Sequence, residues 1–189
     1  LRNGADWYSG IGTPESTGTK VFALTGKATH SGLIEIPMGM SLREVVEEMA
    51  GGTSTGKAIK AVQTGGPSGG VIPEHLLDAP ICYDELKELG SIMGSGGMIV
   101  MDEDDSMVDI AAFYLDFTRD ESCGKCTPCR VGGTQMLDLL HKVGRGEATR
   151  ADIDLIRRLA EAMQRASFCG LGQTAPNPVI STLEYFENE

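Results

Sequence analysis

Three cysteines lie within seven residues of this chain, and a fourth stands well apart from them. Cys123, Cys126 and Cys129 have the spacing C-x₂-C-x₂-C, and Cys169 follows forty residues after Cys129. A chain that turns tightly around a cubane of iron and sulfide can offer a thiolate every third residue, while a distant segment closes the fourth corner. The spacing therefore predicts one [4Fe–4S] cluster with these four cysteines as its ligands.

The competing interpretation is a zinc ion held by the same four thiolates. Zinc closes a small fold equally well, but structural zinc sites usually take their cysteines from two C-x₂₋₄-C pairs. Here three cysteines stand together and one stands alone, which favours the iron–sulfur cluster and leaves zinc as the alternative. The fifth cysteine, Cys82, has no partner at ligand spacing and is expected to be a buried structural thiol.

The residues between and beside the clustered thiols suit a negatively charged group. Gly124 and Pro128 help the chain to turn, and Lys125 and Arg130 add positive charge. A helix that starts near Arg130 would also present free backbone N–H groups and the positive end of its dipole. We therefore expect Gly124, Lys125 and Arg130 to lie next to the cluster.

Four helices are predicted to position the thiols. From about residue 106 the apolar residues recur at spacings of three and four, which predicts three successive helices, and Asn177 as N-cap with Pro178 in the first turn predicts a fourth. The clustered cysteines then occupy the loop between the first and second helices, and Cys169 the loop between the third and fourth. In an up-down bundle these two loops fall at the same end.

An α+β unit of about 85 residues is predicted before the helices. Ser41 and Glu44 match a capping box at the start of a short helix. The Gly-rich stretch 65–70 is interpreted as a turn, and the acidic run 102–105 as favourable charge at the N-terminus of the next helix. The expected elements, in chain order, are strands at 20–25 and 33–36 joined as a hairpin, a helix at 42–49, a strand at 59–64, a helical turn at 83–89 and a strand at 98–101.

Charge and hydropathy exclude several classes of function. With 27 acidic and 16 basic residues the net charge is −11, which argues against a general nucleic-acid or anionic-membrane surface. No apolar run approaches the roughly 20 residues that span a bilayer, and the start has no signal-peptide pattern. We therefore expect a cytoplasmic protein with no nucleic-acid partner and no direct membrane insertion, in a compartment that keeps thiols reduced.

Two motifs carry a resemblance to a known family. Glu121-Ser-Cys-Gly-Lys-Cys-Thr-Pro-Cys-Arg130 and Ser167-Phe-Cys-Gly-Leu-Gly-Gln-Thr-Ala-Pro-Asn-Pro178 resemble the flavin- and NADH-binding subunit of NADH-linked oxidoreductases. That family includes the 51-kDa-type subunit of respiratory complex I and the NAD(P)-linked, often electron-bifurcating, [FeFe] hydrogenases and formate dehydrogenases. The stretch that begins at Gly170 is more similar to the hydrogenase branch.

The resemblance covers essentially the whole chain and implies its domain organisation. Residues 1–12 resemble the tail of the domain that binds FMN and NADH, 13–101 a soluble-ligand-binding β-grasp domain, and 102–189 a four-helix bundle that binds a [4Fe–4S] cluster. It also implies that the four cysteines are the cluster ligands. Gly170 and Leu171, which follow the fourth cysteine, are expected beside the cluster, with the loop from Gly170 near the flavin.

The implied function is electron transfer inside an NAD(P)H-dependent oxidoreductase or hydrogenase complex. The cluster would take electrons from a flavin reduced by NADH and pass them to other iron–sulfur centres, with a thioredoxin-like [2Fe–2S] subunit and a hydrogenase or dehydrogenase catalytic subunit as partners. The domain for FMN and NAD(H) is absent here, so this chain alone is expected to be inactive with NADH. The alternatives are a zinc-stabilised interaction module and a ligand-binding module whose site lies near residues 65–70.

Overall fold

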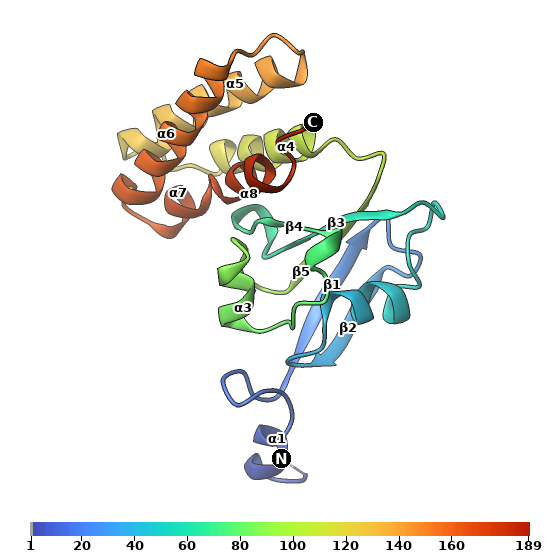
Figure 1. Cartoon of the computed structure of the whole chain (residues 1–189). Helices are drawn as coiled ribbons and strands as arrows, with labels where there is room; N and C mark the ends of the chain where they lie inside the picture. Colours follow the sequence, from blue (N-terminus) through green and yellow to red (C-terminus); the bar gives the residue numbers. More distant parts are fainter. Residues whose placement is uncertain (1) are drawn as a thin grey trace. The chain divides into compact units, whose positions relative to one another are not determined.

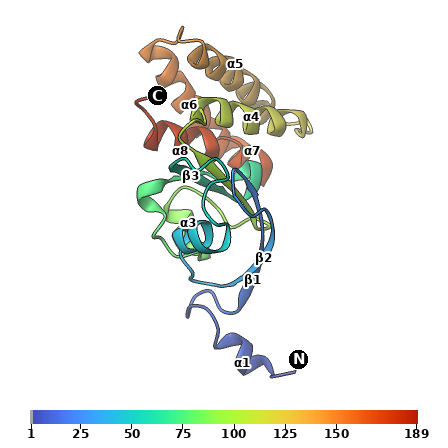
Figure 2. The ribbon, with the colours of Figure 1, turned by 90° about the vertical axis from the view of Figure 1, so that its right-hand side faces the viewer.

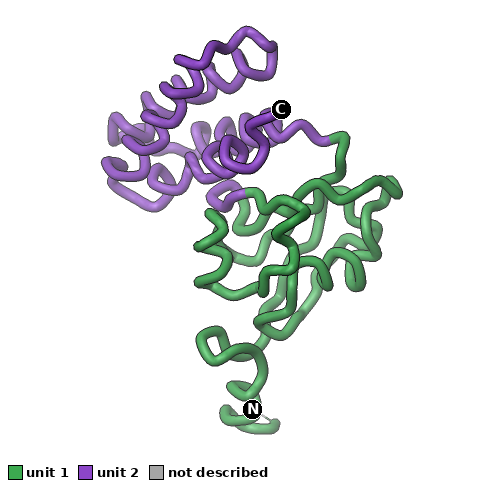
Figure 3. The backbone as a smooth tube through the Cα atoms, in the orientation of Figure 1, with its two compact units in different colours: residues 1–66, 71–104 green, residues 67–70, 105–189 purple. Residues whose placement is uncertain are grey.

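The computed structural model describes residues 2–189, which divide into two compact units (Figure 3). Unit 1 comprises the residues up to Gly66 together with Val71–Asp104, and unit 2 comprises Pro67–Gly70 together with Asp105–Glu189. Unit 1 contains a mixed sheet with helices, and unit 2 is helical. Within residues 2–189, no helix combines the length and the apolar character needed to cross a membrane.

A five-stranded sheet forms the framework of unit 1, with the strand order β2-β1-β5-β3-β4 (Figure 1). Strands β1 and β2 form the antiparallel hairpin that the sequence predicts, and β1 runs parallel to β5. Strand β3 is antiparallel to both β5 and β4. The strands are β1 (Thr19–Gly26), β2 (Gly32–Pro37), β3 (Ile59–Thr64), β4 (Val71–Pro73) and β5 (Gly97–Asp102).

Short helices accompany this sheet, and several of them contribute apolar residues to its core. The predicted capping box is confirmed: the Ser41 hydroxyl accepts a hydrogen bond from the Glu44 backbone N–H, and the Glu44 carboxylate accepts one from the Ser41 N–H. Alternate residues of β1 point into the core, where Phe22 and Leu24 are fully buried together with Leu42. The helices and turns are α1 (Ala5–Ser9), α2 (Leu42–Glu44), the π-helical turn η1 (Val45–Met49), α3 (Tyr83–Glu88) and the 3₁₀ turns η2 (Gly66–Ser68) and η3 (Glu74–Leu76).

Unit 2 is built mainly on four longer helices, α4, α5, α6 and α8 (Figure 2). Their apolar faces form one core. Helix α4 packs against α5 and α8, and α5 packs against α6. Helix α6 begins with a second capping box, formed by Thr149 and Asp152. The elements are α4 (Met107–Asp120), the π-helical turn η4 (Pro128–Gly132), α5 (Gly133–Gly144), α6 (Arg150–Ala166), α7 (Gly170–Thr174) and α8 (Asn177–Tyr185).

The predicted N-cap role of Asn177 is wrong. Pro176 occupies the N-cap position of α8, no side chain caps this helix, and Asn177 is its first residue. The Asn177 side chain instead donates from Nδ2 to the Ser68 carbonyl at 2.8 Å and accepts at Oδ1 from Gln164 Nε2 at 3.3 Å. The polar group is therefore used for tertiary contacts within unit 2, which a local capping pattern does not reveal.

The predicted role of the acidic run 102–105 at a helix end is also wrong for two of its members. Asp102 forms an ion pair with Lys27, with 2.5 Å between Oδ1 and Nζ, and Asp104 pairs with Lys57. Helix α4 begins at Met107, and its N-cap is Ser106, whose hydroxyl accepts a hydrogen bond from the Asp109 backbone N–H at 3.2 Å. These two carboxylates therefore form ion pairs within unit 1.

Candidate metal centre

The clustered cysteines lie where the chain leaves α4 and enters η4. Gly124 has φ +71, a left-handed conformation that favours glycine, and it turns the loop back on itself. The Arg130 guanidinium donates from Nη1 to the Gly124 carbonyl, and the Arg130 backbone N–H donates to the Cys126 carbonyl at 3.1 Å. Arg130 therefore holds the loop against the start of the next helix.

The helix starts earlier than the sequence predicts, because Cys129 lies within the π-helical turn η4 and not in the loop. This correction has a physical consequence. A residue in the first turn of a helix has a backbone N–H without an intrahelical partner, and the Cys129 N–H donates to the Cys126 thiol. The turn thus places the backbone N–H of Cys129 beside the Cys126 thiol.

The second cysteine-bearing segment joins α6 to α7. Ser167 ends α6 in extended conformation, and Cys169, with φ −141 and ψ 167, stands directly before α7. Gln173 of α7 reaches back and donates from Nε2 to the Ser167 carbonyl at 3.0 Å. This short helix therefore fixes the course of the chain around Cys169.

The two segments meet at Cys126. The backbone N–H of Phe168 donates a hydrogen bond to the Cys126 thiol, and together with the Cys129 N–H it lowers the pKa of that thiol. Both donors favour the thiolate, which is the form that binds a metal. Residues that are about forty positions apart in the sequence thus surround one sulfur atom.

Gly172 shows how closely α7 approaches the clustered cysteines. A Cβ at this position would lie 2.9 Å from the Cβ of Cys129 and 2.7 Å from the Ser167 hydroxyl oxygen. Real Cβ atoms do not approach other atoms this closely, so the contact requires a glycine. The sequence analysis did not single out Gly172, because its role depends on what faces it.

The four candidate thiols differ in burial. Cys126 and Cys129 are each 8% exposed, whereas Cys123 and Cys169 are exposed. The fifth cysteine, Cys82, is buried in unit 1, as predicted, and its Sγ lies 3.6 Å from the Thr13 hydroxyl. The candidate site therefore has a buried side and a side that faces solvent.

The other sequence-predicted neighbours of the site lie on the same two segments. Lys125 is exposed in the loop beside Gly124, Gly170 opens α7, and Leu171 is half-buried in its first turn. None of them is among the groups that hydrogen-bond the Cys126 thiol. Their roles beside a cluster stay predictions.

Two serines beside the thiols were not predicted. The Ser122 hydroxyl lies 3.3 Å from the Cys129 sulfur, and Ser167 is buried beside Cys126. Only their positions in the sequence could have indicated that these serines lie beside the thiols. Ser122 directly precedes Cys123, and Ser167 stands two residues before Cys169. Spacing arguments that consider only the thiols miss such neighbours.

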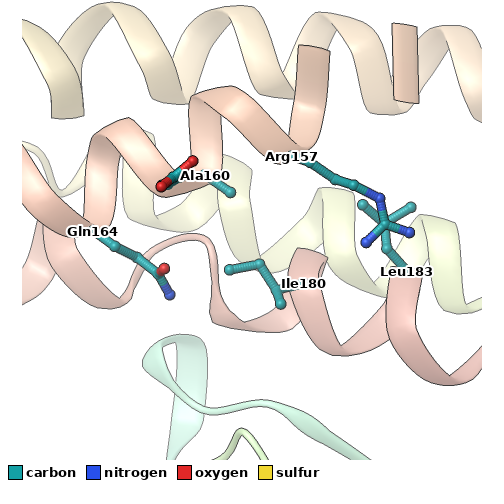
Figure 4. A pocket seen from close by; sticks show the side chains of 6 residues that line it. Arg157, Ala160, Gln164, Ile180 and Leu183 are labelled. Atoms are coloured by element: carbon teal, nitrogen blue, oxygen red, sulfur yellow. The ribbon is translucent and has the colours of Figure 1, made fainter. Parts of the chain in front are cut away.

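A groove of different character lies between α6 and α8 (Figure 4). It is lined by the aliphatic side chains of Ala160, Ile180 and Leu183 and by the polar side chains of Arg157 and Gln164. Its lining includes no cysteine, and it is separate from the thiols. The candidate chemistry of unit 2 therefore lies with the cysteine-bearing segments.

Comparison with known proteins identifies the same region. The family model for the NADH-ubiquinone oxidoreductase-F iron-sulfur binding region matches residues 109–189. The NADP-reducing hydrogenase subunit HndC of Solidesulfovibrio fructosivorans is 58% identical over 187 residues, which cover 99% of this chain and 38% of that subunit. The F 2 subunit of the NADH-quinone oxidoreductase of Rhizobium meliloti (strain 1021) is 40% identical over 100% of this chain and 45% of its own length.

A solved structure agrees with these relatives. A chain of the NAD⁺-reducing [NiFe]-hydrogenase in its H₂-reduced state superposes with a TM-score of 0.87 and 36% sequence identity. The match covers 98% of this chain and 31% of that one. The present chain thus spans less than half the length of the relatives that it matches.

Proposed function

We propose that this chain carries electrons through one [4Fe–4S] cluster, because the family model for the NADH-ubiquinone oxidoreductase-F iron-sulfur binding region matches residues 109–189. The family accounts for the cluster type, and the relatives are subunits of NADH- and NADP-linked oxidoreductases. The proposed ligands are Cys123, Cys126, Cys129 and Cys169.

One observation carries the assignment of ligands. A Cβ at Gly172 would lie 2.9 Å from the Cβ of Cys129, so the segment of the isolated cysteine lies against the segment of the clustered three. The Phe168 N–H, which lowers the pKa of the Cys126 thiol, agrees with this contact. Four thiols on two segments that meet in this way can surround one cubane.

The surroundings of the thiols fit a group with negative charge. Backbone N–H groups of Phe168 and Cys129 already point at the Cys126 sulfur, and hydrogen bonds of this kind stabilise a cluster and tune its potential. Lys125 and Arg130 lie in and beside the same loop and offset negative charge. A [4Fe–4S] cluster bound here supplies transfer of one electron at a time.

The spacing of the thiols favours the cluster over the zinc alternative. Structural zinc sites usually take their cysteines from two C-x₂₋₄-C pairs, whereas here three cysteines stand together and one stands alone. Within the part of the chain that the structure describes, no group of three or more Cys, His, Asp or Glu side chains is arranged to hold a metal ion. The choice of the cluster therefore rests on this spacing and on the family match.

The exposed side of the site indicates where electrons leave or enter. Cys123 and Cys169 are exposed, and Phe168, which directly precedes Cys169, is 83% exposed. We propose that a neighbouring redox centre approaches here, with a flavin reduced by NADH or NADPH as the source of electrons. A flavin accepts a hydride as an electron pair, and a one-electron carrier beside it splits that pair. The proposed receiving partners are a thioredoxin-like [2Fe–2S] subunit and a hydrogenase or dehydrogenase catalytic subunit.

We also propose names and roles for the two parts of the chain. The mixed sheet of unit 1, with its first strand beside its last, supports a β-grasp domain at 13–101, and residues 1–12 are proposed as a connection to a flavin-binding domain. Helices α4, α5, α6 and α8 support a four-helix bundle at 102–189. In this division the electron carrier is the bundle alone.

Substitution of single cysteines in the full chain tests the ligand set. We expect the wild-type chain, purified without oxygen, to contain about four iron atoms and four sulfides, the content of one cubane. Cys126→Ser, Cys129→Ser and Cys169→Ser should each lose most of this iron. The matched control is Cys82→Ala, a buried cysteine of unit 1, which should keep it. Full iron content in Cys169→Ser, or one zinc per wild-type chain, would contradict the proposal.

A further inference from the structure

The Ser122 hydroxyl connects the cysteine loop to a candidate ligand. Its oxygen lies 3.3 Å from the Sγ of Cys129 and accepts a hydrogen bond from the Gly124 backbone N–H, also at 3.3 Å. A hydroxyl has one hydrogen to donate and lone pairs to accept with. Because the Gly124 N–H occupies a lone pair, the hydroxyl hydrogen is available for the sulfur.

A thiolate settles the direction of the contact between Ser122 and Cys129. A neutral thiol can donate as well as accept, but a sulfur bound to iron has lost its proton and only accepts. The Ser122 hydroxyl then becomes a donor to a ligand sulfur. Donors of this kind stabilise the more negative, reduced state of an iron–sulfur centre more than its oxidised state.

We propose that Ser122 is a positioning residue that donates a hydrogen bond to the sulfur of Cys129 and so raises the reduction potential of the cluster. This inference rests on the proposed function.

A redox titration of the full chain, followed by electron paramagnetic resonance, tests this proposal. We expect Ser122→Ala to lower the midpoint potential. The expected change is at least a threefold lower ratio of reduced to oxidised cluster at a fixed potential, which is about 28 mV for a one-electron couple. Ser122→Thr, which keeps the hydroxyl, should restore the wild-type value. Ser181→Ala, which removes a buried hydroxyl that bonds backbone carbonyls of α8, is the matched control and should not shift it.

The outcomes separate this inference from the function on which it rests. A wild-type chain without a [4Fe–4S] signal overturns the proposed function and the inference together. A normal wild-type signal with an unchanged potential in Ser122→Ala overturns the inference alone. If Ser122→Ala does not keep its cluster, Ser122→Thr decides: a wild-type potential supports the donor role, and a potential lowered by about 28 mV or more contradicts it.

Discussion

Gly172 sets the distance between α7 and the clustered cysteines. Its replacement by alanine would place a methyl group 2.9 Å from the Cβ of Cys129 and 2.7 Å from the Ser167 hydroxyl, and overpacking of this kind typically costs about 1–3 kcal/mol. We predict that Gly172→Ala lowers both the iron content and the thermal stability of unit 2. Iron analysis and calorimetry of the full chain measure these effects.

The same helix offers a matched control for this substitution. A Cβ at Gly170 meets nothing within 4 Å, so Gly170→Ala should retain wild-type iron content. If both variants lost iron to the same extent, the effect would come from α7 helix geometry and not from the contact with Cys129. If neither did, the close approach of the two segments would not matter for the site.

At the scale of residues, the sequence predicts the thiols and misses what faces them. The spacing of Cys123, Cys126 and Cys129 can be recognised from the sequence alone, because a chain that turns around a cubane offers a cysteine at every third residue. Ser122 and Gly172 act on atoms that only folding brings near. Their roles follow from a 3.3 Å hydroxyl-to-sulfur distance and from a missing Cβ, and neither has a sequence period.

Among the elements, the ends of β1 and β5 are tied by a charge pair. Asp102 ends β5 and is fully buried, and it accepts hydrogen bonds from Lys27, Thr55 and the Asp104 backbone N–H. The Lys27 ammonium is the main cause that lowers the pKa of Asp102 to about 2, and the Thr55 hydroxyl and the Asp104 N–H add to it. The folded pKa therefore lies below the value of about 3.9 expected in the unfolded chain.

This shift predicts a pH dependence of stability. A carboxyl whose pKa is lower in the folded state stabilises the fold above its unfolded pKa, and that contribution is lost as pH falls through the folded pKa. Between about pH 4 and pH 2, wild-type unit 1 should therefore lose more stability than Asp102→Asn, which lacks the titrating group. Urea unfolding monitored by circular dichroism measures the two slopes. Parallel slopes for the two proteins would contradict the prediction, and the exposed neighbour Glu103→Gln is the control.

The sequence predicts most elements and misses those that are short or depend on tertiary contacts. Strands β1 and β3 have enough β-branched and apolar residues to be recognised, whereas β4 has three residues and exists because it pairs with β3. Helix α1, with five residues and none buried, has no apolar face to predict. The Asn177 error has the same cause, since its partners Ser68 and Gln164 lie far away in the sequence.

On the scale of the whole molecule, all four proposed ligands lie in unit 2. A metal group that binds only the folded site stabilises it by mass action, and its removal withdraws that stabilisation. We predict that removal of the cluster by a chelator under oxidising conditions raises hydrogen exchange at residues 121–132 and 167–176. The sheet of unit 1 should keep its protection, as measured by mass spectrometry. Equal loss of protection in both units would contradict an independent role for unit 2.

The division of the chain is only partly visible in the sequence. The change from a strand-like to a helical pattern near residue 106 marks where the helical region begins. The inclusion of Pro67–Gly70 in unit 2 has no such mark, because it depends on contacts such as that of Asn177 with the Ser68 carbonyl. Hydrophobic periodicity shows which face of a segment is buried. It does not show which distant segment packs against that face.

The central claim is that one [4Fe–4S] cluster is held in unit 2 by cysteines from two segments. Electron paramagnetic resonance of the full wild-type chain, reduced without oxygen and integrated against its iron content, tests this most directly. We predict an S = 1/2 signal of about one spin for every four iron atoms, as one reduced cubane gives. A colourless chain that contains one zinc and gives no signal after reduction would contradict the claim.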